Sequence, residues 1–183
     1  MGTILLTGGT GFIGSHTSVE LLGAGENVIL ADNLSNSSEQ VINRIQQITG
    51  QKPKFYCVDV TDRTGLNRIF EENSIDAVIH FAGLKAVGES VRKPIRYYRN
   101  NLDSTLTLLE VMREQNVKRL IFSSSATVYG KSCSAPFTER TPTGGCTNPN
   151  HRRSEDRDNA LASKVFWSQK TAGGDSDESP PFA

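Results

Sequence analysis

The sequence lacks most of the features that mark a specialised class of protein. Its 183 residues include three cysteines, Cys57, Cys133 and Cys146, and no two of them have the CxxC spacing of many zinc and redox sites. No apolar run approaches the roughly 18 residues of a membrane span, and MGTILLTGG has no signal-peptide pattern. The 20 Lys and Arg residues balance 20 Asp and Glu residues. We therefore expect a cytoplasmic protein with reduced thiols, and neither a metal, a membrane nor a nucleic acid as a partner.

Short apolar segments alternate with segments of helical spacing along the first 125 residues. The apolar segments predict strands at 3–7, 27–32, 54–60, 76–83 and 118–125. The intervening patterns predict helices at 12–25, 37–50, 63–73 and 91–115. The apolar face of the second helix is expected to consist of Val41, Ile42, Ile45 and Ile48. Strands that are apolar on both faces and joined through helices predict an α/β fold, a Rossmann-like doubly wound parallel sheet. Its ligand site is expected at the carboxyl ends of the strands, where the first and fourth strands meet.

A glycine-rich turn, TGGTGFIG, follows the first predicted strand. Gly8, Gly11 and Gly14 have GxxGxxG spacing, and Gly9 with the last two fits GxGxxG. Glycines allow a tight turn and a close backbone approach to a pyrophosphate, for which the helix N-terminus supplies amide donors. A tight strand–helix turn without any ligand is the alternative interpretation.

Two acidic residues follow at the expected ends of the second and third strands. Asp32 lies 18 residues after Gly14, where a carboxylate can accept hydrogen bonds from the adenosine ribose hydroxyls. Its alternative role is a turn or helix cap. DNLSNSS contains no Lys or Arg to neutralise a 2′-phosphate, so the pattern favours NAD over NADP. Asp59 either contacts the adenine amino group or caps the next helix. His16 and His80 are expected to be structural, because no metal-ligand spacing includes them.

Longer motifs carry a resemblance to a known family. HFAGLKAVGES (80–90) and FSSSATVYG (122–130) occur together with TGGTGFIGSHT, DNLSNS and PTGGCTNP. Residues 3–149 thereby resemble the N-terminal half of the UDP-galactose 4-epimerases, which are extended short-chain dehydrogenases. The resemblance implies a bound NAD, a UDP-hexose substrate and interconversion of UDP-galactose and UDP-glucose through a 4-keto sugar. It also implies a homodimer. HFAGLKAVGES favours this family over other nucleotide-sugar epimerases and dehydratases.

The resemblance also implies roles for residues at matched positions. Those implied to bind the cofactor are Gly8, Gly11, Phe12, Ile13, Gly14, Asp32, Asn33, Leu34, Asn36, Ser37, Asp59, Val60, Phe81, Ala82, Gly83, Leu84, Lys85, Asn100 and Ser125. Those implied to contact the substrate are Lys85, Ser125 and Thr127. Ser125 is also the implied catalytic residue, which orients the reacting sugar hydroxyl. A polar strand end is the alternative interpretation of the serine triplet.

The resemblance stops after CTNP. The family continues with Tyr-x-x-x-Lys, in which the tyrosine is the general base, whereas this chain has Asn150 and Ser154 at those positions. Asparagine cannot act as a phenolate base and serine cannot supply the cation that lowers the tyrosine pKa. We therefore expect that this chain does not catalyse the reaction of the family. The function that competes with that of an epimerase is NAD binding by a catalytically dead fragment.

The last segment of the chain differs in composition from the rest. Residues 150–183 contain one leucine, no isoleucine and two adjacent prolines, which disfavours a packed core. We therefore expect an NAD-binding domain over 1–149 and a divergent tail over 150–183, without the substrate domain of the family. A natural disordered tail and a reading frame that shifts near Pro149 would both explain the change, and we favour the shifted frame.

Overall fold

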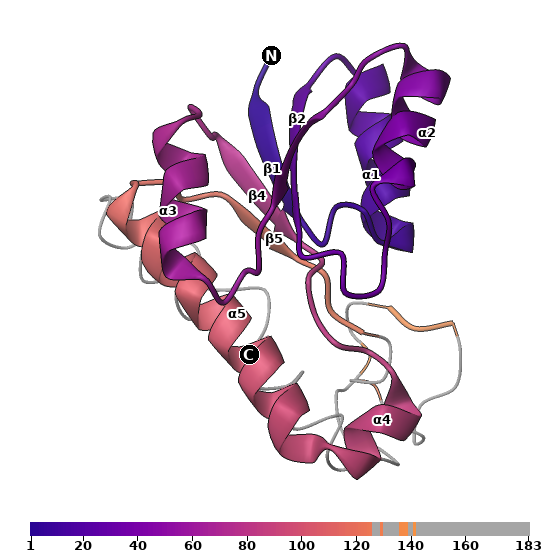
Figure 1. The fold of residues 1–183 in the computed structure, drawn as a ribbon, viewed down its shortest axis with the longest axis vertical. Helices are drawn as coiled ribbons and strands as arrows, with labels where there is room; N and C mark the ends of the chain where they lie inside the picture. The colour runs from indigo at the N-terminus through magenta and orange to yellow at the C-terminus, as the bar shows by residue number, and fades with distance from the viewer. Residues whose placement is uncertain (126–128, 130–135, 139–140, 142–183) are drawn as a thin grey trace.

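The computed structural model describes residues 1–125, 129, 136–138 and 141, and within them it contains a parallel sheet (Figure 1). The five strands lie in the order β3-β2-β1-β4-β5. Their bounds are Thr3–Thr7 (β1), Asn27–Asp32 (β2), Lys54–Cys57 (β3), Ala77–His80 (β4) and Leu120–Phe122 (β5). The predicted doubly wound fold is confirmed, and β1 pairs with β2 on one side and with β4 on the other.

Helices cover both faces of the sheet, as Figure 1 shows. The helices are Phe12–Gly23 (α1), Gln40–Thr49 (α2), Arg63–Glu71 (α3), Val87–Arg92 (α4) and Pro94–Glu114 (α5). The pair α1 and α2 lies on one face and the pair α3 and α5 on the other, while α4 lies beyond the carboxyl ends of the strands. This arrangement leaves the carboxyl edge of the sheet as the place where loops from every strand meet.

Two hydrophobic cores, one on each face, explain why the strands are apolar throughout. Successive residues of a strand point to opposite faces, so Leu5 enters the core beneath α3 and α5, whereas Leu6 enters the core beneath α1 and α2. Neither side chain is accessible to solvent. Burial of a leucine is worth about 1.5–3 kcal/mol, so both faces of β1 stabilise the sheet.

The helix predicted over 91–115 is wrong in its first turn. The structure has a separate α4 that ends at Arg92, and α5 begins at Pro94. Lys93 between them has φ −131° and ψ 56°, because the ring of a proline excludes the preceding residue from the helical region. Proline itself is well suited to the first helical position, where its missing N–H is not needed.

Three strands are shorter than predicted, and one helical face is narrower. The strand predicted over 76–83 is β4, which spans only Ala77–His80. β3 ends at Cys57, so Asp59 lies two residues beyond the strand and not at its end. β5 spans only Leu120–Phe122. Ile48 was expected on the apolar face of α2 but is 70 % exposed. At 100° per residue it lies about 90° from the midpoint of the buried Ile42 and Ile45, at the margin of that face.

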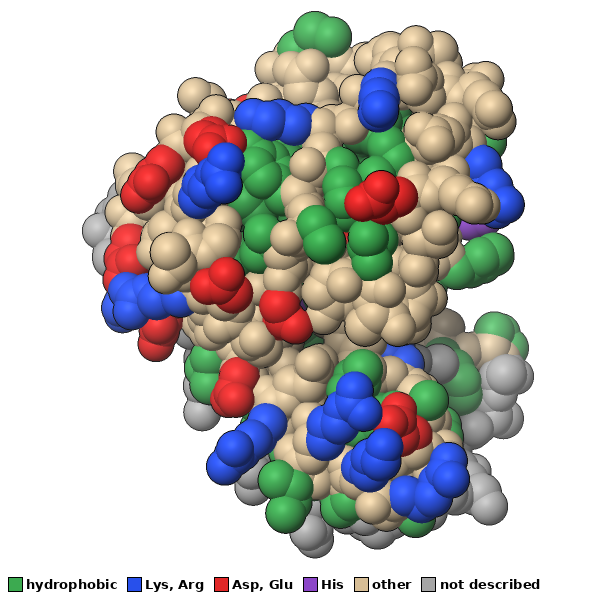
Figure 2. Space-filling model, viewed as in Figure 1, with side chains coloured by type: hydrophobic (Ala, Val, Ile, Leu, Met, Phe, Trp, Pro, Cys, Tyr) green, Lys and Arg blue, Asp and Glu red, His purple; other side chains and the backbone are tan. Residues whose placement is uncertain are grey.

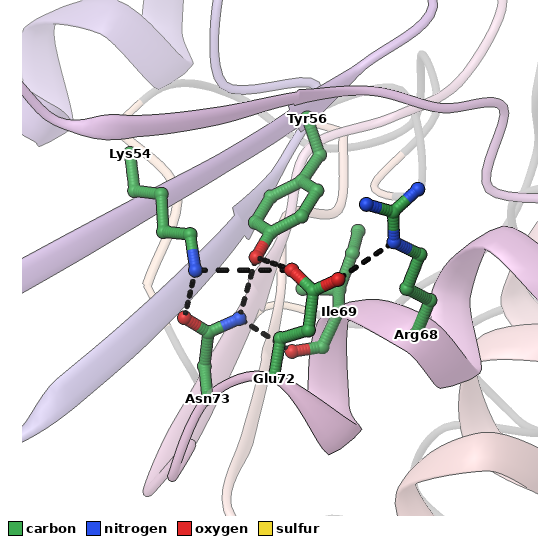
Figure 3. Close-up of polar contacts among 6 residues, drawn as sticks. All are labelled: Lys54, Tyr56, Arg68, Ile69, Glu72 and Asn73. Atoms are coloured by element: carbon green, nitrogen blue, oxygen red, sulfur yellow. Dashed lines mark hydrogen bonds and ion pairs between the residues drawn. The ribbon is translucent and has the colours of Figure 1, made fainter.

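The exposed edge of β3 is tied to the C-terminal end of α3 by polar side chains (Figure 3). Glu72 accepts hydrogen bonds from Tyr56 Oη and Arg68 Nε, each at 2.7 Å. Asn73 Nδ2 donates to Tyr56 Oη at 2.9 Å, and Lys54 Nζ donates to Asn73 Oδ1 at 2.9 Å. The hydrogen bond from Tyr56 is the main reason why the pKa of Glu72 is lowered. Charged side chains of this kind hinder pairing of the edge strand with another chain.

A buried histidine joins the sheet to α5. His80 is 2 % exposed; its Nδ1 lies 2.5 Å from Thr7 Oγ1 and its Nε2 lies 3.3 Å from Thr105 Oγ1. Thr105 Oγ1 donates its proton to the Asn101 carbonyl, so it can only accept from His80. The ring is therefore the neutral tautomer with the proton on Nε2, and Nδ1 accepts from Thr7. Burial lowers the pKa of His80 to about 4, and the charge of Lys85 adds to the shift.

This histidine is predicted to make the fold acid-sensitive. Its folded pKa of about 4 lies below the ordinary value of 6.5, so the unfolded chain binds the proton first. The contribution of the neutral ring to the free energy of unfolding is fully present above pH 6.5. As the pH falls toward 4 this contribution is lost, by up to about 3 kcal/mol. Urea unfolding between pH 7.5 and 4.5 should show this loss in the wild type and not in His80→Gln. The exposed His16→Gln is the matched control; an unchanged pH dependence in His80→Gln would contradict the assignment.

Candidate active site

A cavity of about 250 Å³ opens at the carboxyl edge of the sheet. Its described lining combines the loops that follow the strands with one face of α5: Gly8, Gly11, Phe12, Ile13, Gly14, Asp32, Asn33, Ser35, Asn36, Val58, Asp59, Val60, Phe81, Ala82, Gly83, Leu84, Lys85, Asn100, Ser104 and Ser123. Most residues singled out from the sequence are thus brought to one place. Leu34, Ser37 and Ser125 are not among the lining residues.

The glycine-rich turn passes too close to its neighbours for side chains. Gly8 has φ +68°, and a Cβ there would lie 2.7 Å from Ala82 N. A Cβ on Gly14 would collide with the Gly8 carbonyl oxygen. Glycine is therefore required at both positions, because a Cβ would collide with the backbone of Phe81 and Ala82 in one case and of Gly8 and Gly9 in the other.

The N-terminus of α1 faces this cavity without a side-chain cap. The helix starts at Phe12, the N-cap residue is Gly11, and no side chain accepts from the first amides. No acidic residue occupies the first turn. Uncapped first-turn amides and the positive end of the helix dipole form a site for an anion such as a phosphate. Phe12 and Ile13 are 82 % and 55 % exposed and line the cavity beside these amides.

Asp32 is a buried carboxylate that holds two loops. It is 6 % exposed. Its Oδ2 accepts from Thr10 N at 3.1 Å, and its Oδ1 accepts from Leu34 N at 2.9 Å and from Ser37 Oγ at 3.1 Å. The turn-capping role that the sequence left open is therefore present. Leu34 and Ser37, both implied cofactor contacts, donate these hydrogen bonds to Asp32 in this structure. A carboxylate has about four acceptor positions, so one remains for a ligand hydroxyl.

Asp59 caps a turn, but not the helix that follows it. Its Oδ1 accepts from Thr61 N at 2.9 Å and Thr61 Oγ1 at 2.7 Å, and its Oδ2 accepts from Asn33 Nδ2 at 2.8 Å. The N-cap of α3 is Asp62, whose side chain accepts from Thr64 N, so the prediction of Asp59 as the helix cap is wrong. Partial burial raises the pKa of Asp59, but the bonds from Thr61 and Asn33 outweigh it and lower that pKa. Asp59 therefore lines the cavity as an anion.

The 81–85 loop is held by an asparagine that the motifs did not identify. Asn101 Oδ1 accepts from Leu84 N at 2.8 Å, and Asn101 Nδ2 donates to Leu84 O at 3.1 Å. Asn100 lines the cavity and donates to Asn101 Oδ1 at 3.2 Å. The family resemblance implied a cofactor contact for Asn100 and no role for Asn101. The pair of asparagines at 100–101 was the available signal, but its second member could be assigned only once α5 was positioned against the loop.

Four lining residues were not predicted as site residues: Ser35, Val58, Ser104 and Ser123. Ser35 lies within DNLSNS and Ser123 within FSSSATVYG, Val58 precedes Asp59, and Ser104 lies one helical turn after Asn100. Among the residues expected at the sugar and at the catalytic positions, the structure describes Ser125. Thr127, Asn150 and Ser154 lie outside the described residues.

The described part of the chain has neither a metal-ligand cluster nor a membrane-spanning helix. No cluster of three or more His, Cys, Asp or Glu residues there has an arrangement that could hold a metal ion. No helix there combines the length and the apolar character needed to cross a bilayer.

The chain is similar to known proteins over this same region. A family model described as NAD dependent epimerase/dehydratase family matches residues 4–152. UDP-glucose 4-epimerase of Yersinia enterocolitica is 57 % identical over 147 residues, which are 80 % of this chain and 44 % of that protein. The Bacillus subtilis UDP-glucose 4-epimerase is 56 % identical over 146 residues, 80 % of this chain and 43 % of that protein.

A solved structure agrees with these sequence matches. UDP-glucose 4-epimerase from Bifidobacterium longum, in complex with NAD⁺ and UDP, superposes with a TM-score of 0.86 at 55 % identity, covering 91 % of this chain and 49 % of that chain. This chain thus spans less than half the length of the curated relatives that it matches. A match over residues 4–152, with a sheet of the same architecture, shows that the chain belongs to the NAD dependent epimerase/dehydratase family.

Proposed function

We propose that this chain binds NAD in the cavity at the carboxyl edge of its sheet. The observation that carries the proposal is the uncapped N-terminus of α1, packed without side chains at Gly8 and Gly14 and placed beside the buried carboxylate of Asp32. These residues fit a dinucleotide, because they supply amides for a pyrophosphate and an acceptor for a ribose hydroxyl. The structure of the Bifidobacterium longum relative, which contains NAD⁺, supports the same group here.

Each wall of the cavity then has a role toward the dinucleotide. The amides at Phe12 and Ile13 would bind the pyrophosphate, and Asp32 would accept from the adenosine ribose. Val58, Asp59 and Val60 would flank the adenine. The 81–85 loop, fixed by Asn101, would line the nicotinamide end, with the Lys85 ammonium close to the phosphates or the substrate. Asn33 and Asn36 offer further amide groups at the adenosine end.

The UDP-galactose 4-epimerases that this chain resembles interconvert UDP-galactose and UDP-glucose, and we propose that this chain cannot carry out that reaction. Bound NAD supplies a hydride acceptor and donor for the C4 carbon of the sugar. Ser125 would orient the C4 hydroxyl, with Thr127 beside the sugar. A base must also remove the hydroxyl proton, and neither Asn150 nor Ser154 can do so or assist it. The function that follows is NAD binding without epimerisation, in a binding domain over residues 1–149.

We further propose that α4 and α5 form a self-association surface. Val87 and Val91 on α4 are 53 % and 55 % exposed, and Ile95 and Leu106 on α5 are 71 % and 40 % exposed. Val87 and Val91 are four positions apart on α4, and Ile95 and Leu106 are eleven positions apart on α5, so the members of each pair share a helix face. Figure 2 shows Lys and Arg side chains around an acidic side chain in the region of α4 and the start of α5. An apolar stripe beside a charged surface is typical of an interface between two copies of a chain.

The dinucleotide proposal predicts a specific loss in Asp32→Asn. The amide keeps the size of the side chain but removes the charge, and hydrogen bonds to charged groups are worth about 1.5–3 kcal/mol. The dissociation constant for NAD⁺ in calorimetric titration should rise by roughly 10- to 100-fold. Asp62→Asn is the matched control, because asparagine is also a good N-cap and Asp62 lies outside the cavity lining. Equal affinities of the Asp32→Asn variant and the wild type would contradict the assignment.

The proposed lack of a base predicts little or no turnover of UDP-galactose. General acid–base assistance contributes about 10²–10⁴-fold, so the rate in a coupled UDP-glucose dehydrogenase assay should lie at least 100-fold below that of the Bacillus subtilis relative. NAD⁺ binding measured on the same sample would establish that it is folded. A rate within tenfold of the relative would reject the proposal.

The self-association proposal predicts a monomer for Ile95→Lys. A lysine in the centre of an apolar interface is desolvated without a partner, so the dimer dissociation constant should rise at least about tenfold. Sedimentation velocity over a concentration series measures the change. Ile48→Lys is the control, because Ile48 is 70 % exposed but lies on α2. A monomeric wild type, or a dimer unaffected by Ile95→Lys, would count against this surface.

A further inference from the structure

We infer that Thr10 is a positioning residue of the dinucleotide site, which fixes Asp32 through a closed ring of hydrogen bonds; this inference rests on the proposed function. Thr10 belongs to the glycine-rich turn but is the residue between its glycines, so the motif gave it no role. It is 2 % exposed, which is unusual for a polar residue in a surface turn. Its contacts give the reason for that burial.

The ring joins the amide and the hydroxyl of Thr10 to the side chains of Asp32 and Ser37. Thr10 N lies 3.1 Å from Asp32 Oδ2, Thr10 Oγ1 lies 2.7 Å from Ser37 Oγ, and Ser37 Oγ lies 3.1 Å from Asp32 Oδ1. Thr10 follows β1, whereas Asp32 and Ser37 belong to β2 and the loop after it. The ring therefore connects the pyrophosphate turn with the adenosine-side loop.

The direction of each hydrogen bond in the ring is determined by chemistry. An ionised carboxylate only accepts, so Ser37 donates its one hydroxyl proton to Asp32. Ser37 can then only accept from Thr10, which must donate its own proton to Ser37. With both hydroxyl protons committed, Ser37 cannot reorient without breaking its bond to the buried carboxylate, and Thr10 cannot reorient without breaking its bond to Ser37.

This arrangement fixes the conformation in which Asp32 meets a ligand. Thr10 and Ser37 hold the two carboxylate oxygens from opposite ends, and Leu34 N adds a third bond at 2.9 Å to Oδ1. Among the contacts of the described residues, Oδ2 accepts only from Thr10, so the free acceptor position is on that oxygen. Without the Thr10 hydroxyl, Ser37 loses the donor that orients its own hydroxyl, so the bond from Ser37 to Oδ1 weakens and the carboxylate is held mainly by the two backbone amides.

The test compares ribose recognition in Thr10→Val and Thr10→Ser. Valine has the shape of threonine and keeps the backbone amide, but it has no hydroxyl, whereas serine restores the hydroxyl. The probes are NAD⁺ and its analogue that lacks the 2′-hydroxyl of the adenosine ribose, titrated calorimetrically into the full chain. The wild type should prefer NAD⁺ by about tenfold. In Thr10→Val the preference should fall below about threefold, and in Thr10→Ser it should return.

A measurement without ligand separates this inference from the proposed function. Amide exchange of Leu34, followed by NMR, reports whether Asp32 still accepts its bond. It should become several-fold faster in Thr10→Val than in the wild type and Thr10→Ser. Wild-type exchange or an undiminished ribose preference in folded Thr10→Val would overturn the positioning role. Failure of the wild type to bind NAD⁺ at all would instead reject the proposed function, and the exchange result would then show whether the ring exists.

Discussion

The site depends on the close approach of the glycine-rich turn to the segment that leaves β4. Gly8 N donates to Ala31 O at 2.8 Å, and Phe81 N donates to Thr7 O at 2.9 Å, so the end of β1 is held from both sides. The left-handed backbone of Gly8 then turns the chain directly over Ala82. Because no side chain separates these segments, the N-terminus of α1 lies at the switch point of the sheet, where helix amides can face a ligand.

Polar side chains around the cavity act mainly on the backbone of the loops that line it. Asp32 accepts from the amides of Thr10 and Leu34, and Asn101 bonds both polar groups of the Leu84 peptide. Asp59 does the same for the turn at Thr61. Loops fixed in this way do not have to be ordered when a ligand binds, which reduces the entropic cost of binding. The same hydrogen bonds give Thr10 and Asn101, which do not line the cavity, a role in the position of its loops.

The sequence predicts the sheet well because its signals are local. Apolar runs, helical spacing and the glycine-rich turn required no knowledge of distant contacts, and the place of the first strand beside the fourth followed from known rules of parallel sheets. The failures occur where a contact between distant segments decides the outcome. Asn101 and Thr10 acquire their roles only when α5 meets the 81–85 loop and when the loop after β2 meets the glycine turn. The break at Pro94 was a local signal, and it should have divided the helix predicted over 91–115.

We propose that binding and turnover are separable in this chain, because the described residues that line the cavity lie between positions 8 and 123, whereas the positions expected to hold the base and its cation are 150 and 154. The central claim is therefore that NAD binds the folded chain. The most direct measurement is thermal unfolding with and without NAD⁺. A ligand that binds only the folded state at 100 times its dissociation constant adds about 2.7 kcal/mol of stability. The account predicts a cooperative transition that moves to higher temperature as NAD⁺ is added. A cooperative transition that does not move, even at millimolar NAD⁺, would contradict it.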